Sequence, residues 1–250
     1  MEFSKVYITW KREYGEQIVL KLCSMLREYG IAHVFDEPQD CDLAIMVGGD
    51  GTMLKHQSFL ECPMFSINPG KSVGHYSTAT GGDFVKKVRK LFGGREGKDY
   101  FIREFTRLET VINNTKMPFQ SINEVLVSPI YVRRLMKAEL TIDGRKTRER
   151  NSGIIVYTPS GSYAYAKAAG AKPFDTPGRF GVVAVAPYDG RLRKGAITMT
   201  KGKVTITCAS KEGEVCSDGQ EEQACKLGKG DVVIIKKGGK PARIIFFKKT

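Results

Sequence analysis

Residues 43–52 read Leu43-Ala44-Ile45-Met46-Val47-Gly48-Gly49-Asp50-Gly51-Thr52, an apolar run followed by glycines around one acid. Such a run is typical of a buried parallel strand. Glycines let the following backbone turn sharply and approach a ligand closely. A helix predicted over residues 53–61 would present unpaired N–H groups, which favour an anionic phosphate. The stretch therefore predicts a phosphate loop at the carboxyl end of a strand.

Asp50 has two interpretations within this stretch. As a carboxylate at a strand end beside a phosphate loop, it is a candidate catalytic base. As an aspartate just before a helix, it is also a favoured N-cap residue and could have only that structural role. The local sequence leaves both interpretations open.

Length and composition limit the class of protein. A chain of 250 residues with 41% hydrophobic content has enough apolar residues for a packed core, which argues against wholesale disorder. No apolar run approaches the roughly 18 residues of a membrane span, and the start lacks the long apolar segment of a signal peptide. The six cysteines form no CxxC pair, which indicates free thiols and a cytoplasmic protein.

The net charge of +13 favours anionic partners such as nucleotides. Basic clusters occur at Arg133-Arg134 and over residues 145–150, but no recognisable nucleic-acid-binding module accompanies them. We therefore expect neither a nucleic-acid partner nor a membrane partner.

The apolar pattern changes near residue 100. Before it, predicted strands over 6–8, 31–35, 43–47 and 63–68 alternate with helices over 14–29 and 83–92, which is typical of a doubly wound α/β domain. Ligands of such sheets bind beyond the carboxyl ends of the strands, where Asp50 would lie. After it, many short predicted strands separated by Asp-Gly and Gly-Gly turns indicate a β-rich, two-sheet domain.

The glycine-rich segment over residues 93–98 predicts the boundary between the two domains. We expect an α/β domain over residues 1–98 that carries the phosphate loop, and a β-rich dinucleotide-binding domain over residues 99–250. The extreme C-terminal tail is compatible with a return to the first domain.

A second group of polar residues lies in Thr158-Pro159-Ser160-Gly161-Ser162-Tyr163-Ala164-Tyr165. It follows a predicted strand and leads into a helix of small residues. Hydroxyls, a glycine and two aromatic rings suit a nucleotide pocket, but they also suit a capped helix start with core tyrosines.

Together these segments resemble the NAD kinase family. In order, the chain has Gly48-Gly49-Asp50-Gly51-Thr52-Met53-Leu54, Ile67-Asn68-Pro69-Gly70, Asn123-Glu124, the 158–165 segment and Asp218-Gly219-Gln220. The first segment is shared with the wider superfamily of diacylglycerol, sphingosine and 6-phosphofructo-kinases. The 158–165 segment with Asn123-Glu124 points to NAD kinase, and the resemblance spans roughly residues 40 to 236.

The resemblance implies a fold and an activity. The family has an N-terminal α/β domain and a C-terminal β-rich domain with NAD held between them. It is usually a homodimer or homotetramer, whose site can take residues from a neighbouring subunit. It transfers the terminal phosphoryl group of ATP, or in some members of polyphosphate, to the 2′-hydroxyl of the adenosine ribose of NAD. The product is NADP, and Mg²⁺ or another divalent metal is required.

The resemblance also assigns site residues. Asp50 resembles the family's proton acceptor, which must lie within about 3 Å of the reacting hydroxyl. Asn123 and Glu124 resemble the pair that holds the ribose and dinucleotide, although a strand-edge cap is the alternative. The other nucleotide-binding candidates are Gly48, Gly49, Gly51, Thr52, Lys55 and Asn68 around the phosphate loop; Ser162, Tyr163, Ala164, Tyr165 and Ala168 in the pocket; Gln220; and Arg134, Arg150 and Ser152 beside the dinucleotide. No side chain is assigned to a metal, and for Lys55 a solvated lysine is the alternative.

Four departures from the family pattern bear on the acceptor pocket. Ser152 replaces an aspartate that contacts the dinucleotide, and Tyr163 replaces a small threonine. The usual Gly-Gly after the alanine helix is Gly170-Ala171, and the loop after Asn68 is one residue longer before Gly74. The alternatives are therefore a kinase of the same superfamily acting on a nucleoside, sugar, polyol or lipid, a non-catalytic nucleotide-binding protein, and a nucleic-acid binder suggested only by charge. NAD kinase remains the first prediction.

Overall fold

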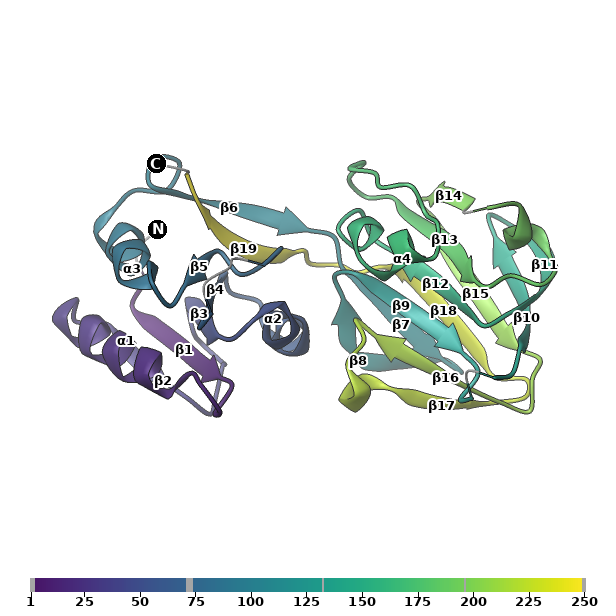
Figure 1. Ribbon diagram of the computed structural model, residues 1–250, viewed down its shortest axis with the longest axis horizontal. Coiled ribbons are helices and arrows are strands. Elements are labelled where there is room, and N and C mark those ends of the chain that lie inside the picture. Colours follow the sequence, from purple (N-terminus) through teal and green to yellow (C-terminus); the bar gives the residue numbers. More distant parts are fainter. Residues whose placement is uncertain (1–2, 71–73, 132, 196, 249–250) are drawn as a thin grey trace. The chain divides into compact units, whose positions relative to one another are not determined.

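The computed structural model describes residues 3–70, 74–131, 133–195 and 197–248, which form two compact units (Figure 1). The first unit comprises Met1–Phe105 and Ala242–Thr250, and the second comprises Thr106–Pro241. Each unit is built around its own hydrophobic core. Within the described residues, no helix has the length and apolar character that crossing a membrane requires.

A mainly parallel sheet forms the centre of the first unit. Its order is β2-β1-β3-β4-β19-β6, with β5 added to β4. Strands β1 to β5 are parallel to one another, and β19 is parallel to β4 but antiparallel to β6. The strands are β1 (Lys5–Trp10), β2 (Ala32–Val34), β3 (Leu43–Val47), β4 (Met64–Asn68), β5 (Ala79–Thr80), β6 (Tyr100–Phe105) and β19 (Ala242–Phe247).

Helices cover both faces of this sheet. α1 (Glu16–Glu28) and α3 (Phe84–Gly93) pack into one core with β3, where Leu22 and Val88 join Ile45. α1 ends where Gly30 takes a left-handed conformation with φ of 68°. α2 (Asp50–His56), continued by the 3₁₀ turn η1 (Gln57–Phe59), lies on the other side of β3 (Figure 1). The doubly wound arrangement predicted from the sequence is confirmed.

The C-terminal strand completes the first unit. β19 lies between β4 and β6 and pairs with β6 over six residue pairs, from Ala242↔Phe105 to Phe247↔Tyr100. Ile245 of this strand is fully buried in the core of the first unit. Residues 99–105 lie in the first unit because β6 pairs with β19, so the unit extends beyond the boundary placed at residue 98 from the glycine-rich segment.

Two antiparallel sheets of six strands form the second unit, in the orders β11-β10-β15-β18-β7-β8 and β14-β13-β12-β9-β16-β17. The first sheet contains β7 (Leu108–Ile112), β8 (Thr115–Ser121), β10 (Met136–Ile142), β11 (Arg145–Asn151), β15 (Lys203–Cys208) and β18 (Val232–Lys237). The second contains β9 (Glu124–Ser128), β12 (Gly153–Tyr157), β13 (Phe180–Val185), β14 (Ile197–Thr200), β16 (Glu212–Ser217) and β17 (Cys225–Gly228).

The two sheets of the second unit enclose a single core. Val125 and Ile154 from one sheet pack with Leu140 and Ile206 from the other. On the outer face of the second sheet, α4 (Tyr165–Ala168) contributes Ala166 to a smaller core with Tyr157. Three short 3₁₀ turns complete the unit: η2 (Gly161–Tyr163), η3 (Arg191–Lys194) and η4 (Glu221–Gln223). The predicted β-rich, two-sheet domain is confirmed.

Strand β11 was not predicted from the sequence. It pairs with β10 along its whole length, from Met136↔Asn151 to Ile142↔Arg145, and it forms an edge of its sheet. An edge strand exposes much of its surface, and β11 consists of charged and polar residues, so the apolar alternation that marks a strand is missing.

Candidate functional site

The phosphate-loop stretch lies at the carboxyl end of β3. A Cβ added to Gly48 would collide with the side chain of Thr52, so this position requires glycine. The pairing Val47↔Ile67 places Asn68, the last residue of β4, beside Gly48. Added Cβ atoms at Gly49 and Gly51 would meet no heavy atom within 4 Å, so a ligand can approach their backbone. The parallel sheet thus brings these candidates together.

The structure corrects the N-cap interpretation of Asp50. Helix α2 begins at Asp50 rather than at Met53, its N-cap residue is Gly49, and no side chain caps it by a hydrogen bond. The Asp50 carboxylate instead receives hydrogen bonds from the loop that precedes β5. Oδ2 accepts the His75 N–H at 2.7 Å. Oδ1 accepts the Tyr76 and Ser77 N–H groups, each at 3.0 Å, and the Ser77 hydroxyl at 3.1 Å.

These bonds fix the carboxylate, and Gly74 makes room for it. A Cβ on Gly74 would collide with the Asp50 carboxyl group. Oδ1 has three donors and Oδ2 has one, so Oδ2 keeps capacity to accept a further proton donor. The carboxylate is half-buried rather than sealed in the core.

The sequence did not identify His75 and Ser77 as part of this site. Burial lowers the pKa of the His75 imidazole, while the nearby Asp50 charge acts in the opposite direction. A histidine and a serine after the second glycine loop carry no local pattern that points to a carboxylate 25 residues earlier in the chain. Residues 71–73 of that predicted loop lie outside the described part of the chain.

Two further candidates of the first unit are Lys55 and Asn68. Lys55 is exposed near the end of α2. Asn68 accepts the Gly70 N–H on Oδ1 at 3.0 Å, which is an Asx-type turn. Asn68 ends β4, so it lies at the same edge of the sheet as Asp50.

In the second unit, antiparallel pairing gathers three separate segments. Tyr157 pairs with Glu124, so the end of β12 lies beside the start of β9. Ser217 pairs with Val125, which places the end of β16 on the other side of β9. Asn123-Glu124, the segment from Thr158, and Asp218-Gly219-Gln220 therefore meet at one end of the sheet, as their resemblance to one family site requires.

Asp218 joins these segments, although the sequence did not single it out as a site residue. Its carboxylate accepts three backbone N–H groups, from Ile122 at 2.9 Å, Asn123 at 2.8 Å and Glu124 at 3.0 Å. Its own N–H donates to the Glu124 carbonyl at 2.9 Å. The Asp-Gly pair signalled a turn, and Asp218 and Gly219 do have positive φ of 49° and 67°, but nothing local indicated a partner 94 residues away.

Glu124 is a buried acid with an unsatisfied oxygen. It is 7% exposed, and its Oε2 has no hydrogen-bond partner within the described part of the chain. Burial, reinforced by the Asp218 charge, raises the pKa of Glu124 to about 8. Burial also raises the pKa of Asp218 to about 7, against the effect of its three N–H donors and of Arg107. Strongly perturbed acids of this kind are frequent at functional sites.

The Thr158 loop is held tightly against Asn123. The Thr158 N–H donates to the Asn123 carbonyl at 2.9 Å, and the hydroxyls of Thr158 and Ser160 donate to the Ile122 carbonyl at 2.5 and 2.7 Å. A Cβ on Gly161 would collide with the Asn123 carbonyl oxygen, so only glycine fits.

The side chains after Gly161 differ in their accessibility. Ser162 is fully buried; its hydroxyl donates to the Pro159 carbonyl at 2.5 Å and accepts the Phe174 N–H at 3.1 Å, so it supports the loop. Tyr163 and Tyr165 are 47% and 44% exposed, contrary to the alternative that they are core residues. The Tyr163 hydroxyl donates to Asp175 at 3.1 Å. Ala164 is half-buried and Ala168 is exposed.

Gln220 belongs to the same end of the sheet. Its side-chain amide donates to the Asp218 carbonyl at 3.0 Å, and its backbone N–H donates to the Ser217 carbonyl at 2.9 Å. These bonds close the turn that carries Asp218.

Arg134, Arg150 and Ser152 lie elsewhere. Ser152 precedes β12 and Thr158 follows it, so six residues of extended chain, roughly 20 Å, separate them. Arg150 donates to Asp189 at 2.6 Å and lies 4.3 Å from the centre of the Tyr188 ring. The structure therefore does not bring these three residues to the Glu124 end of the second unit.

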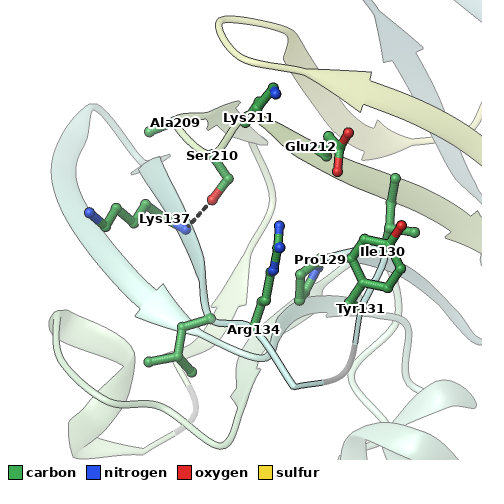
Figure 2. A pocket seen from close by; sticks show the side chains of 10 residues that line it. Pro129, Ile130, Tyr131, Arg134, Lys137, Ala209, Ser210, Lys211 and Glu212 are labelled. Atoms are coloured by element: carbon green, nitrogen blue, oxygen red, sulfur yellow. Dashed lines mark hydrogen bonds between the residues drawn. The ribbon is translucent and has the colours of Figure 1, made fainter.

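Arg134 lines a cavity beyond the far end of β9, with a volume of about 280 Å³ (Figure 2). Figure 2 shows its side chain extending into this space between Ser210 and Glu212, with Lys137 turned away. Its guanidinium lies 5.4 Å from the centre of the Tyr131 ring.

The described residues contain no group of three His, Cys, Asp or Glu side chains placed to hold a metal ion. Mg²⁺ is commonly bound through substrate phosphates and water with few protein ligands. The described residues are compatible with a divalent ion that is bound in this way, through substrate phosphates.

Comparison with known families gives two matches that together cover most of the chain. The ATP-NAD kinase N-terminal domain matches residues 12–95, and the ATP-NAD kinase C-terminal domain matches residues 122–247. The NAD kinase of Methanoregula boonei is 31% identical over 218 residues, which cover 84% of this chain and 77% of that protein. The NAD kinase of Azotobacter vinelandii is 31% identical over 215 residues, 82% of this chain and 70% of that protein.

Two solved structures share the fold. Yeast NADH kinase complexed with NADH has a TM-score of 0.84 at 18% identity, covering 99% of this chain and 84% of that one. An NAD kinase from Archaeoglobus fulgidus in complex with ATP has a TM-score of 0.77 at 24% identity, covering 98% of this chain and 93% of that one.

Proposed function

The chain belongs to the NAD kinase family, and we propose that it phosphorylates NAD on the 2′-hydroxyl of the adenosine ribose, with ATP as donor and NADP as product. The observation that carries this proposal is the meeting of Asn123-Glu124, the Thr158 loop and Asp218-Gly219-Gln220 at one end of a sheet. The order of these segments along the chain had suggested the family, and the family matches confirm it.

Asp50 is the proposed general base. Its Oδ2 would accept the proton of the 2′-hydroxyl, because Oδ1 already has three donors. The hydroxyl oxygen then bonds to the terminal phosphorus of ATP, the bond to the bridging oxygen breaks, and ADP leaves. The backbone at Gly49 and Gly51, which has open space above it, and the Lys55 ammonium would contact phosphate oxygens.

Glu124, Asn123, Gln220 and the exposed Tyr163 and Tyr165 rings are proposed to bind the nucleotide. A divalent ion, Mg²⁺ in the first instance, is proposed to arrive as part of the ATP substrate and to neutralise phosphate charge. Polyphosphate in place of ATP is a further donor to be tested.

Arg134, Arg150 and Ser152 are proposed to serve a site on another subunit. Within one second unit, Ser152 is separated from Thr158 by the length of β12, roughly 20 Å, which is too far to contact the same ribose. A homodimer or homotetramer in which these residues face a neighbouring nucleotide would give them the role that the sequence resemblance implies.

The test is conversion of NAD and ATP to NADP by the purified protein with Mg²⁺, measured by an NADP-specific cycling assay. Turnover supports the proposal, and Asp50→Asn controls for contaminating kinases. NADH, nucleosides and polyols should be assayed in parallel by ADP release, because the Tyr163 ring and its bond to Asp175 change the pocket surface. Turnover of one of these compounds without turnover of NAD would replace NAD as the acceptor.

A further inference from the structure

The sheet of the first unit reverses its winding direction between β1 and β3. From β1 the chain passes through α1 to β2 on one side, and from β3 it passes through α2 to β4 on the other side. The two helices lie on opposite faces of the sheet (Figure 1). Ligands of such sheets bind beyond the carboxyl ends of the strands, at the point of reversal. Residues 11–15, which follow β1, and the phosphate loop, which follows β3, flank this point.

Strand pairing places the end of β1 directly beside the phosphate loop. Trp10 pairs with Val47, and the Lys11 N–H donates to the Val47 carbonyl at 3.0 Å. The strand order β2-β1-β3 puts β2 on the far side of β1. A phosphate bound at Gly49 and Gly51 therefore has the end of β1 as its neighbour on the β2 side of the sheet.

Aromatic side chains gather on that side. Trp10 is the last residue of β1, Phe35 follows β2, and the centres of their rings lie 5.5 Å apart at an angle of 75°. The His33 imidazole of β2 lies 5.6 Å from the Phe35 ring at 79°. A Cβ added to Gly15 would lie 3.1 Å from the Trp10 Cβ, so the backbone at the start of α1 packs against this side chain. We refer to Trp10, His33 and Phe35 as the ring cluster.

The ring cluster is partly open to solvent. Phe35 is 39% exposed and lies outside the core of the first unit. Tyr14, in the segment after β1, is 53% exposed, and the Lys11 ammonium lies 5.1 Å from the centre of its ring. Exposed rings offer a flat apolar surface on which a base can stack, because every nucleobase has a π-face.

We infer that the ring cluster binds the adenine base of the ATP donor, while the phosphates of ATP occupy the loop at Gly49 and Gly51. This inference rests on the proposed function for the identity of the donor. Neighbouring strands lie about 4.8 Å apart, so the end of β2 lies about 10 Å from the end of β3, and an extended nucleoside triphosphate can bridge the two. Polyphosphate has no base, so the ring cluster makes the site favour ATP over polyphosphate.

The first measurement uses the fluorescence of Trp10, which is the single tryptophan of the chain. The full-length protein is titrated with ADP and Mg²⁺ in the absence of NAD, and Trp10 is excited at wavelengths that adenine does not absorb. A saturable change in Trp10 emission is expected. Inorganic tripolyphosphate carries phosphates without a base, so it should change the emission far less at saturation. Equal changes with the two compounds, or no change with bound ADP, would overturn the inference.

The second measurement compares two exposed phenylalanines of the first unit by calorimetry. Phe35→Ala should raise the Kd of ADP at least about fivefold, because it removes a stacking surface of the base. The Kd of tripolyphosphate should stay within about twofold of the wild type, since the phosphates do not contact this ring. Phe59, which is 59% exposed, lies after α2, at the end of that helix away from the phosphate loop. Phe59→Ala is the matched control and should leave the Kd of ADP within about twofold.

Equal losses for ADP and tripolyphosphate in Phe35→Ala, or equal losses of ADP affinity in the two variants, would contradict binding of the base by the ring cluster. In the kinase assay, Phe35→Ala should raise the KM for ATP with little change in kcat. The two proposals can fail separately. Formation of NADP with an unchanged ADP affinity in Phe35→Ala contradicts only the inference. Base-dependent binding of ADP without phosphorylation of NAD contradicts only the proposed reaction. If neither ADP nor ATP binds, both are wrong.

Discussion

At the scale of single residues, Asp50 joins the phosphate loop to a second loop. The four hydrogen bonds to its carboxylate come from residues 75–77, so this side chain orders that loop in addition to its proposed chemical role. An aspartate that only capped a helix would bond to its own first turn, and α2 shows no such bond.

Asp50→Asn is therefore expected to reduce phosphoryl transfer by at least about a hundredfold, because an amide cannot take the hydroxyl proton. The measurement is kcat for NADP formation. Ser77→Ala is the matched control, since it removes one hydrogen bond from Oδ1 and leaves the base; it should cost less than about tenfold. Equal losses in the two variants would assign Asp50 a purely structural role.

Gly161 is a residue where a single added methyl group should destabilise the second unit. An alanine Cβ would meet the Asn123 backbone, which the Asp218 carboxylate holds in place. Gly161→Ala should lower the free energy of unfolding by about 1–3 kcal/mol. Gly239→Ala, where the new Cβ meets nothing within 4 Å, should stay within about 0.5 kcal/mol. Urea titration of both variants decides this, and two equal stabilities would contradict the close approach.

Glu124 also makes stability depend on pH. Its pKa rises from 4.5 in the unfolded chain to about 8 in the folded one, so between these values the folded state holds a proton that the unfolded state has released. The free energy of unfolding should therefore fall as pH rises through this window and level off above about pH 8. Glu124→Gln should show a shallower fall in urea titrations at a series of pH values. Parallel slopes would mean that Glu124 is ionised when folded.

At the scale of elements, the return of β19 to the first unit links the end of the chain to its beginning. Ile245→Ala should lower the stability of the first unit by about 2–5 kcal/mol, because Ile245 is fully buried among β-strand and helix residues of that core. Hydrogen exchange of amides in β1, β3 and β4 measures the loss. Amides of β12 in the second unit should keep their protection.

The control for this substitution is Ile234→Ala on β18. Ile234 is half-buried in the second unit, so the loss should be smaller and should affect β12 rather than β3. Faster exchange in both units of the Ile245→Ala protein would contradict the assignment of β19 to the first unit.

At the scale of the whole molecule, the separation of Arg150 from Thr158 leads to a prediction about assembly. If Arg150 serves the site of a neighbouring subunit, mixed oligomers of Asp50→Asn and Arg150→Ala chains should regain activity. One of the sites in such a mixture combines an intact Asp50 with an intact Arg150. The measurement is NADP formation after the two inactive proteins are unfolded, mixed and refolded together.

The control mixture combines Arg134→Ala and Arg150→Ala chains. Both substitutions fall in the same group of residues, so every site in a mixed oligomer receives one of them and no activity should return. Rescue in the control, or none in the test mixture, would contradict the sharing of residues between subunits.

The sequence by itself determined the local elements of this protein. The apolar run over 43–47 and the glycines after it specified β3 and the turn before Asp50, because side-chain periodicity and glycine chemistry act over a few residues. The order of Asn123-Glu124, the Thr158 loop and Asp218-Gly219-Gln220 was enough to indicate the family. Strand β11 could not be predicted in this way, since an exposed edge strand needs no apolar alternation.

Only the tertiary structure decided which of these residues act together. Strand pairing brings Asp218 to the N–H groups of residues 122–124 and places β19 beside β6. Hydrogen bonds hold the 75–77 loop on Asp50. The extended strand β12 separates Ser152 from Thr158 by its whole length. These contacts join residues far apart in the chain, and their energy depends on pairing and burial, for which the local sequence carries no signal.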